Sequence, residues 1–565
     1  MITSEANTDS TSGSGLAICL QKTNRVKIIA LIMAFFWYLP LAGKEIAITP
    51  APNPITPEKN CFDIDEILLV PNVSSLVAGV KKTFLFLSPI LATYSHQCLD
   101  KEKITHLLNA LKLASLKKGY ITTEFGITPQ DLRSKQLIIT LQTTIVGAIE
   151  VQGKQAGWLW GKDYAINIGD ILSIKPIERG LYNFKRLKTN QPVVEILPMP
   201  ASLPDKPQES KISIENPQPA LPIYASISAD NAGSLSTGIY QTSLQFGLEN
   251  LLSLAESFHT YAVFTPDMSQ AHSIYVSSDF SIPWRRFLLS VSGSYAHYAQ
   301  KLSIGQKTFS YNGYGANLDI KGSVLVYLDN LNSLNFNFGL GKRWAQNYLE
   351  NIALIVQNRN LTNIYANINY SRYIKNASIS VSIGVKQGVK WLGSMKNFPN
   401  NNVKSAPNFF YTLPTIDVYT SVPLRLWDQN FAYSGFVKTQ ISRTHLYASE
   451  KFGLGGIYSV RGFDSSVLSG EIGVLNRNDW TYYLPSVFKL TFVPSLGLDM
   501  GYTSGIDRSR NDGLEDSGFI IGSAAGVKIY WSKYFNAQIW GYAPLYNPHN
   551  LKGRYFYASV GANWE

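Results

Sequence analysis

A period-two alternation of apolar and polar side chains runs through the C-terminal part of the chain, from Leu221 onward. In the stretches 334–341 and 378–385, Leu, Phe, Ile or Val alternates with Asn, Ser or Gly. This pattern is typical of strands with one apolar and one polar face. Soluble β-sandwiches share it, but here small residues dominate the polar face, as in a water-filled lumen, and no separate apolar sheet covers the other face. We therefore predict a transmembrane antiparallel β-barrel over residues 218–565.

The N-terminal segment has the pattern of a secretory signal. Three basic residues within 22–27 precede an apolar stretch over 28–42. This stretch is shorter than the ~20 residues that a transmembrane helix needs. We assign residues 1–43 to the signal and 44–60 to a short proline-rich stretch.

The chain has three cysteines. Cys19 would leave with the signal, so Cys61 and Cys98 would remain as an even pair in an oxidising compartment. This count favours a disulfide, and the alternative is two unpaired buried thiols.

Two small α/β units are expected between the signal and the barrel, at 61–152 and 153–217. Apolar residues at helical spacing follow Asp100, which is available as an N-cap, and apolar residues alternate with acidic ones after Cys61. The predicted elements are a strand at 61–67, a helix at 100–111, strands at 119–123 and 137–141, a helix at 177–187, and strands at 193–197 and 211–214.

A glycine-rich run with a single arginine interrupts the alternating strands at 452–464. Glycine permits positive φ and close backbone approach, while Arg461 offers five fixed donors to a carboxylate. The run predicts a loop that packs inward, and the alternative is a surface hairpin tip with an incidental arginine.

Motifs in both halves of the chain, taken together, resemble the two-partner secretion family of outer-membrane transporters, the haemolysin activation/secretion proteins. The matching motifs are Cys61-Phe62-Asp63-Ile64, Cys98-Leu99-Asp100, Gly119-Tyr120-Ile121-Thr122-Thr123, Pro129-Gln130-Asp131-Leu132, Val460-Arg461-Gly462-Phe463, Leu468-Ser469-Gly470-Glu471 and Arg477-Asn478-Asp479. The resemblance implies that 61–152 and 153–217 are tandem polypeptide-transport-associated (POTRA) domains, and that the barrel has about sixteen strands. It also strengthens the prediction of a disulfide between Cys61 and Cys98.

The resemblance further implies a site inside the barrel. Val460, Arg461, Gly462 and Phe463 would form a loop motif that lines the pore. In the stretch 496–501 the apolar residues would face lipid, while Asp499 would lie between two glycines on the lumen side. Family members hold the loop arginine against such an aspartate, so we predict that Asp499 is the lumen partner of Arg461 in a bidentate contact.

The function implied is translocation of an unfolded secreted exoprotein of the haemolysin or adhesin class across the outer membrane of a Gram-negative cell. The N-terminal domains would capture the exoprotein in the periplasm, and export would need no nucleotide. The other partners implied are outer-membrane lipid and the barrel insertion machinery. Two alternatives remain, a barrel-assembly factor and a passive porin. Family members often begin with a helix that plugs the pore, but we predict no plug helix in 44–60, because proline breaks the helical hydrogen-bond ladder.

Other chemistry is not indicated by the sequence. It contains no phosphate-binding loop, no zinc-protease motif, no nucleophile elbow, and no cysteine or histidine cluster with metal spacing. We predict no enzymatic activity, no cofactor and no bound metal. The net charge of +11 is not concentrated in basic runs interleaved with stacking aromatics, so nucleic acid is not an expected partner.

Overall fold

The computed structural model describes residues 61–72, 77–151, 154–155, 166–189, 192–200, 207–215, 222–234, 236–252, 254–265, 271–304, 306–397, 406–465, 467–506, 517–548 and 550–564. The signal segment and the stretch 44–60 lie outside the described residues, and the prediction about a plug helix falls there as well. No helix in the described part of the chain is long and apolar enough to span a membrane.

The first α/β unit packs helices against a small sheet of order β2-β5-β4, and a separate two-stranded sheet pairs β1 with β3. Its elements are β1 (Phe62–Ile64), β2 (Glu66–Pro71), α2 (Val77–Thr83), η2 (Leu85–Leu87), α3 (Ser88–Tyr94), β3 (Gln97–Leu99), α4 (Lys101–Lys117), β4 (Glu124–Gly126), η3 (Leu132–Ser134) and β5 (Gln136–Gln142). The predicted N-cap is confirmed, because the Asp100 carboxylate accepts the Lys103 amide at 2.8 Å. Cys61 and Cys98 are disulfide-bonded, and the neighbouring Asp63 pairs with Cys98 between β1 and β3.

The strand predicted at 119–123 is wrong. Gly119, with φ of +94°, follows the end of α4 in a turn. Tyr120 then packs on the ring of Phe84 at 4.8 Å between centroids. The hydroxyl of Thr144, at the start of the next unit, donates to Thr122 Oγ1 at 2.7 Å, and the hydroxyls of Thr123 and Thr143 bond to each other at 3.0 Å. Local β propensity is therefore overridden by the helix end and by side-chain contacts.

The second unit is a four-stranded sheet of order β7-β6-β9-β8, and helix α6 contributes to its core. The elements are β6 (Thr144–Val151), β7 (Lys154–Gln155), α6 (Ile174–Lys185), β8 (Val193–Pro198) and β9 (Gln208–Glu215). The boundary predicted at 152/153 is too late, because β6 pairs in parallel with β9 of this second sheet. Only Thr143 separates β5 from β6, so a near-continuous run of strand residues conceals the change of sheet.

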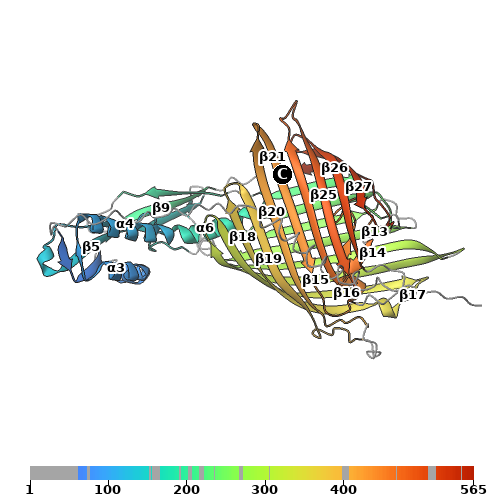
Figure 1. Ribbon diagram of the computed structural model, residues 1–565, viewed down its shortest axis with the longest axis horizontal. Helices are drawn as coiled ribbons and strands as arrows, with labels where there is room; N and C mark the ends of the chain where they lie inside the picture. The colour runs from blue at the N-terminus through green and yellow to red at the C-terminus, as the bar shows by residue number, and fades with distance from the viewer. Residues whose placement is uncertain are drawn as a thin grey trace, which may run out of the picture. The chain divides into compact units, whose positions relative to one another are not determined.

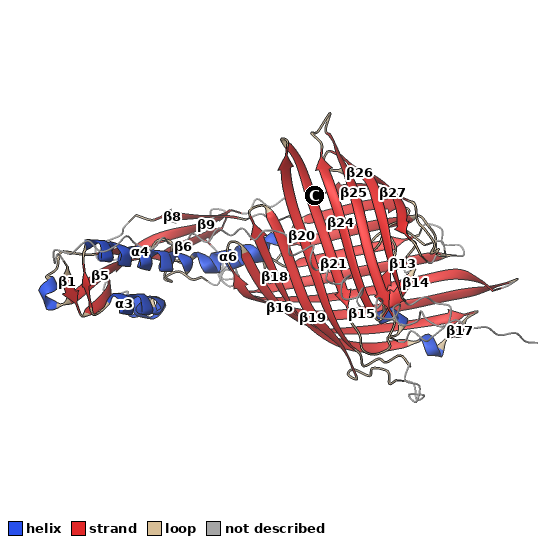
Figure 2. Ribbon diagram, in the orientation of Figure 1, coloured by secondary structure: helices blue, strands red, loops and turns tan. Residues whose placement is uncertain are grey.

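Within the described residues, sixteen antiparallel strands close into a barrel, and the two-residue β17 adds to the end of β16 (Figures 1 and 2). The wall consists of β10 (Ile223–Asp230), β11 (Gln241–Glu249), β12 (Ser257–Phe264), β13 (His272–Trp284), β14 (Phe287–Ile304), β15 (Lys307–Leu328), β16 (Asn332–Leu349), β18 (Arg359–Ile374), β19 (Ala377–Val389), β20 (Thr412–Leu426), β21 (Gln429–Gln440), β24 (Ile472–Tyr483), β25 (Leu490–Ser504), β26 (Gly518–Trp531), β27 (Phe535–Tyr546) and β28 (Phe556–Trp564). The short elements in its loops are β17 (Ile352–Ala353), η4 (Ile355–Gln357), η5 (Ala448–Glu450), β22 (Phe452–Leu454) and β23 (Leu468–Gly470).

Closure depends on β10 pairing with β28, so the first and last strands of the wall leave no open edge. The alternation predicted from the sequence is the alternation between the two faces of this wall. On β16, Phe336 and Phe338 are exposed on the outer face while the intervening Asn337 is buried. The predicted barrel is confirmed.

Candidate functional site: a loop held inside the barrel

The loop between β21 and β24 folds back and packs against the lumen side of the wall. We call residues 452–470 the inner loop. Its two short strands, β22 and β23, pair with each other. Its apolar residues form a buried cluster with two wall residues, namely Phe452, Leu454, Val460, Phe463 and Leu468 with Leu475 and Ile520. The loop therefore has a core of its own and is no surface hairpin tip.

Glycines on the facing strands make room for this packing. A Cβ at Gly473 would lie 2.1 Å from the ring of Phe452. One at Gly501 would lie 2.7 Å from Leu454. Both are closer than real Cβ contacts, so the loop and the wall fit each other only because these positions carry no side chain.

Arg461 at the tip of the loop is 1% exposed, and Asp499 on β25 is fully buried. The two side chains make a bidentate contact. The Nε of Arg461 donates to Asp499 Oδ2 at 2.6 Å, and its Nη2 donates to Oδ1 at 2.7 Å. The main-chain N–H of Arg461 also donates to Oδ2, at 3.0 Å. The structure thus brings together the two residues that the sequence predicted as partners.

Asp479 on β24 is a second carboxylate at this site, and it accepts from Arg461 Nη1 at 2.6 Å. The carbonyl of Asn478 accepts from Nη2 at 3.3 Å, and the ring of Trp540 lies 5.6 Å from Cζ. Burial alone would lower the pKa of Arg461, but the hydrogen bonds and charges of the two carboxylates outweigh it and raise that pKa. The guanidinium is therefore held charged between two anionic side chains.

The neighbours of Arg461 in the motif have separate contacts. Val460 and Phe463 are fully buried in the loop core. Gly462 has φ of +94°, and a Cβ there would lie 2.7 Å from the carbonyl carbon of Ala543 on β27. Its carbonyl accepts from the Arg554 amide at 3.1 Å. The four motif residues are thus fixed by the core of the inner loop, by β24 and β25, and by β27 with the loop that follows it.

The segment that leads into the inner loop is anchored by residues that no sequence motif indicated. We call residues 445–451 the loop stem. The Glu450 carboxylate forms two ion pairs. Its Oε1 lies 3.0 Å from Nη1 of Arg343 on β16, and its Oε2 lies 2.8 Å from Nζ of Lys386 on β19. Tyr447 stacks on Phe409 with centroids 4.1 Å apart. Through Glu450 the stem is therefore bound to β16 and β19, and it also contacts Glu471 just before β24, whereas the tip is bound to β24, β25 and β27.

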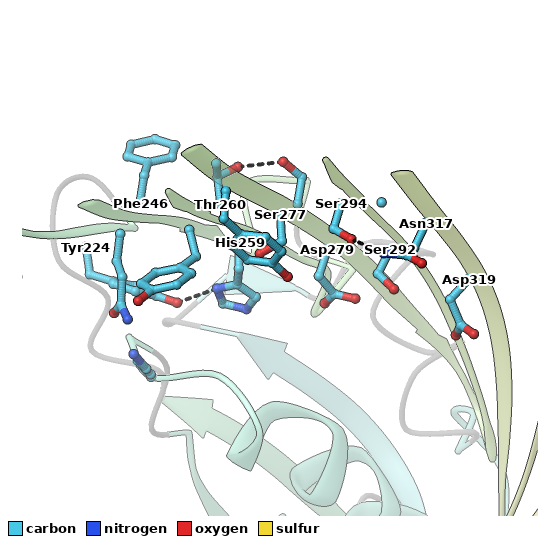
Figure 3. A pocket seen from close by; sticks show the side chains of 16 residues that line it. Tyr224, Phe246, His259, Thr260, Ser277, Asp279, Ser292, Ser294, Asn317 and Asp319 are labelled. Carbon is cyan, nitrogen blue, oxygen red and sulfur yellow. Dashed lines mark hydrogen bonds between the residues drawn. The ribbon is translucent and has the colours of Figure 1, made fainter. Parts of the chain in front are cut away.

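The lumen wall on β12 to β15 is lined by small polar and acidic side chains. Two cross-strand rows lie on this face, Ser277, Ser294 and Asn317 in one and Asp279, Ser292 and Asp319 in the other. A hollow of about 450 Å³ is open along them (Figure 3). Tyr261 and Tyr275 also line the hollow, so this part of the wall offers a passing chain both hydrogen bonds and aromatic contacts. The described residues contain no group of three or more side chains that could hold a metal.

Comparison with known proteins identifies the architecture. A family described as haemolysin secretion/activation protein ShlB/FhaC/HecB matches residues 208–529, more than half of the chain. The chain belongs to this family. A second match, to the ShlB-type POTRA domain, covers residues 83–143 of this haemolysin secretion/activation protein. Both matches agree with the family that the motifs indicated.

Individual relatives cover most of the chain. The outer membrane transporter CdiB-2 of Burkholderia pseudomallei strain 1026b is 25% identical over 515 residues, which are 88% of this chain and 85% of the relative. The haemolysin transporter protein HpmB of Proteus mirabilis is 26% identical over 475 residues, 82% of this chain and 80% of the relative. The solved structure of CdiB from Escherichia coli superimposes with a TM-score of 0.77 at 22% identity, covering 91% of this chain and 93% of that one. This last likeness shows the same fold.

The family confirms the predicted class of function and location. This ShlB/FhaC/HecB protein is an outer-membrane β-barrel export pore with POTRA domains on the periplasmic side. Members of the family are transporters and not enzymes.

Proposed function

We propose that this transporter captures one unfolded exoprotein in the periplasm and passes it through the barrel to the cell surface, with the inner loop shaping the conduit. The observation that carries the proposal is the pairing of Arg461 with two carboxylates on adjacent strands of the wall. Such a buried, fully paired cation fixes the loop tip at one place inside the lumen. A passive porin has no need of a loop fixed in this way.

The periplasmic domains supply an edge for capture. Strand β8 pairs with β9 on one side, and no partner lies on its other side within the described residues. An extended polypeptide segment can add to such an edge by main-chain hydrogen bonds, which give affinity without demanding a particular sequence. Val193 and Leu197, both exposed on β8, offer apolar contacts to the added strand.

The exoproteins of relatives suggest the class of partner. Of the relatives named above, one is a haemolysin transporter protein and another is an outer membrane transporter of the CdiB type. We propose a partner of the haemolysin or adhesin class for this chain. Folding of the exoprotein outside the cell, with no return through the narrow lumen, would give export its direction without nucleotide. We also propose two further contacts. The outer face of the barrel contacts outer-membrane lipid, and the barrel insertion machinery binds the chain when it enters the membrane.

The experiment is an export assay with the full-length chain and candidate exoproteins of the haemolysin or adhesin class from the same genome. Cells with both should release the exoprotein, and cells without the transporter should retain it in the periplasm. A porin would instead change the uptake of small solutes, and an assembly factor would change the abundance of other outer-membrane barrels. Release of the exoprotein at the same rate without the transporter would reject the proposal.

A further inference from the structure

An apolar groove lies on the outer face of the wall, away from the lumen and the inner loop. It crosses β14, β15, β16 and β18 and encloses about 580 Å³. Leu289, Gly322 and Phe338 are directly opposed in the strand register, so they share one face of the sheet. The main lining side chains are Phe287, Leu289, Ile320, Phe338, Trp391 and Leu392.

The groove has a floor and a roof. Its floor is Gly322, where a Cβ would lie 2.6 Å from the ring of Phe338 and 2.9 Å from that of Phe287. Its roof is the segment that follows β19, in which Trp391 and Leu392 remain 56% and 64% exposed. The missing side chain at Gly322 and the two bulky side chains of Trp391 and Leu392 line one hollow, in contrast to the even surface of an ordinary barrel wall.

A cation lies just beyond the groove, in contact with the lining residue Leu392. Lys342 follows Leu340 on the same outer face of β16 and is only 7% exposed. Its Nζ donates to the carbonyl of Leu392 at 2.7 Å and to Thr362 Oγ1 at 3.1 Å. An ammonium has three donors, and among the described residues no carboxylate lies within ion-pair distance of this one. The charge of Lys342 is therefore solvated by two neutral oxygens but not neutralised.

The position of Lys342 along the strand fits the outer leaflet. The turns at one end of the barrel are short, as at 285–286 and 427–428, while the other end carries the long connections, including 390–411. Short turns face the periplasm and long loops face outward in such barrels. Lys342 lies toward the long-loop end of β16, beside Trp344, whose ring is 5.7 Å from Nζ. Lysine and tryptophan side chains concentrate where hydrocarbon meets head groups.

We propose that this groove binds one molecule of the anionic glycolipid of the outer leaflet, lipopolysaccharide, through its lipid A part. An acyl chain fills the apolar hollow between Gly322 and Trp391, and a phosphate of the head group pairs with Lys342. Basic pockets next to apolar surface are the arrangement that recognises anionic lipid head groups. The proposal is independent of the exoprotein and of its path through the lumen.

The test uses the full-length chain in phosphatidylcholine nanodiscs doped with lipid A, with bound lipid counted by native mass spectrometry. The variant Lys342→Met should weaken retention of lipid A about fivefold, the effect of one lysine near a charged lipid surface. Trp391→Ala should weaken it as well by opening the roof. The matched control is Lys321→Met, because Lys321 lies on the neighbouring strand with its side chain on the lumen face, and it should retain lipid A as the unaltered chain does.

Further arms identify the ligand. Lipid A that lacks its phosphates should bind weakly to the unaltered chain. Its retention should equal that of intact lipid A by Lys342→Met. Inorganic phosphate alone should not be retained. Equal retention of lipid A by Lys342→Met and the unaltered chain would overturn the proposal. So would an equal loss in Lys321→Met, which would mean general attraction to a basic protein. Equal retention of phosphatidylglycerol would overturn the assignment to the glycolipid.

Discussion

Gly497 on β25 lies directly beneath the guanidinium of Arg461, and a Cβ at Gly497 would lie 2.2 Å from Nη2. The cross-strand partner of Gly497 is Asp479, and Asp499 is two residues further along the same strand. The absent side chain thus leaves the space in which one arginine reaches two carboxylates. The position of the loop tip is set by a glycine as much as by the charges around it.

We predict that Gly497→Ala displaces Arg461 and reduces export of the exoprotein at least tenfold at equal abundance in the outer membrane. There is no space for a methyl group at position 497, because Nη1, Nη2 and Cζ of Arg461 would all lie within 2.8 Å of it. The measurement is secretion per unit of folded transporter. Gly541→Ala is the matched control, since its nearest neighbour would be a carbonyl oxygen at 3.9 Å, and it should export normally. Equal loss in both variants would contradict the prediction.

We predict that Arg461→Ala and Asp499→Ala each leave the barrel inserted but strongly reduce export, and that the double variant adds little more. Removing Arg461 leaves Asp499 as an uncompensated buried charge, which costs about 3–5 kcal/mol, and removing Asp499 leaves the buried Arg461 with Asp479 as its one remaining carboxylate. Removing both avoids this cost, so the two effects are not additive. The measurement is a double-mutant cycle on export and on the temperature at which the folded barrel is lost in semi-native electrophoresis. Additive losses, or normal export by Arg461→Ala, would show that the pair lacks this role.

The sequence predicted the parts of this site that follow from local patterns. Period-two alternation placed Asp499 on the lumen face, and the glycines around Arg461 indicated a loop that folds tightly. Asp479 was part of a recognised motif but was assigned no contact. Its contribution depends on the register of β24 against β25, which pairs Asp479 with Gly497. The register between two strands is set by the whole sheet and cannot be predicted from the sequence of either strand alone.

The loop stem was missed for a related reason. Glu450 is bound by Arg343 and Lys386, which precede it by 107 and 64 residues. Each is an ordinary polar residue in its own segment, and only closure of the barrel brings them to one place. The strand wrongly predicted at 119–123 is the opposite case, in which a local composition rich in Thr and Tyr was overruled by a helix end and by tertiary contacts.

We predict that reducing the bond between Cys61 and Cys98 destabilises the first α/β unit by about 3–4 kcal/mol, because the bond closes a loop of nearly forty residues in the unfolded chain. The measurement is the rate of proteolysis of the periplasmic part of the intact transporter at 37 °C, with and without reductant. The variant Cys98→Ala should be cleaved rapidly in both conditions. Cleavage of the unaltered chain that does not respond to reductant would contradict the prediction.

The last prediction concerns the loop stem. Glu450→Gln keeps the shape of the side chain but removes the charge that faces two cations, so Arg343 and Lys386 would repel each other across a neutral amide. Both contacts are partly buried, since the side chain of Glu450 is 6% exposed while those of Arg343 and Lys386 are 35% and 32% exposed, and partly buried pairs are screened less by salt than exposed ones.

We expect the stem to detach from β16 and β19 while the tip stays bound to Asp499, because the two anchors lie on different parts of the wall. Single-channel recordings in lipid bilayers should then show larger and more frequent openings, and a protease added outside should cleave within 445–451. Asp428→Asn is the matched control, because its pairing with Arg425 is exposed and such surface pairs contribute little. Openings unchanged in Glu450→Gln, or increased equally in Asp428→Asn, would mean that the stem does not narrow the conduit.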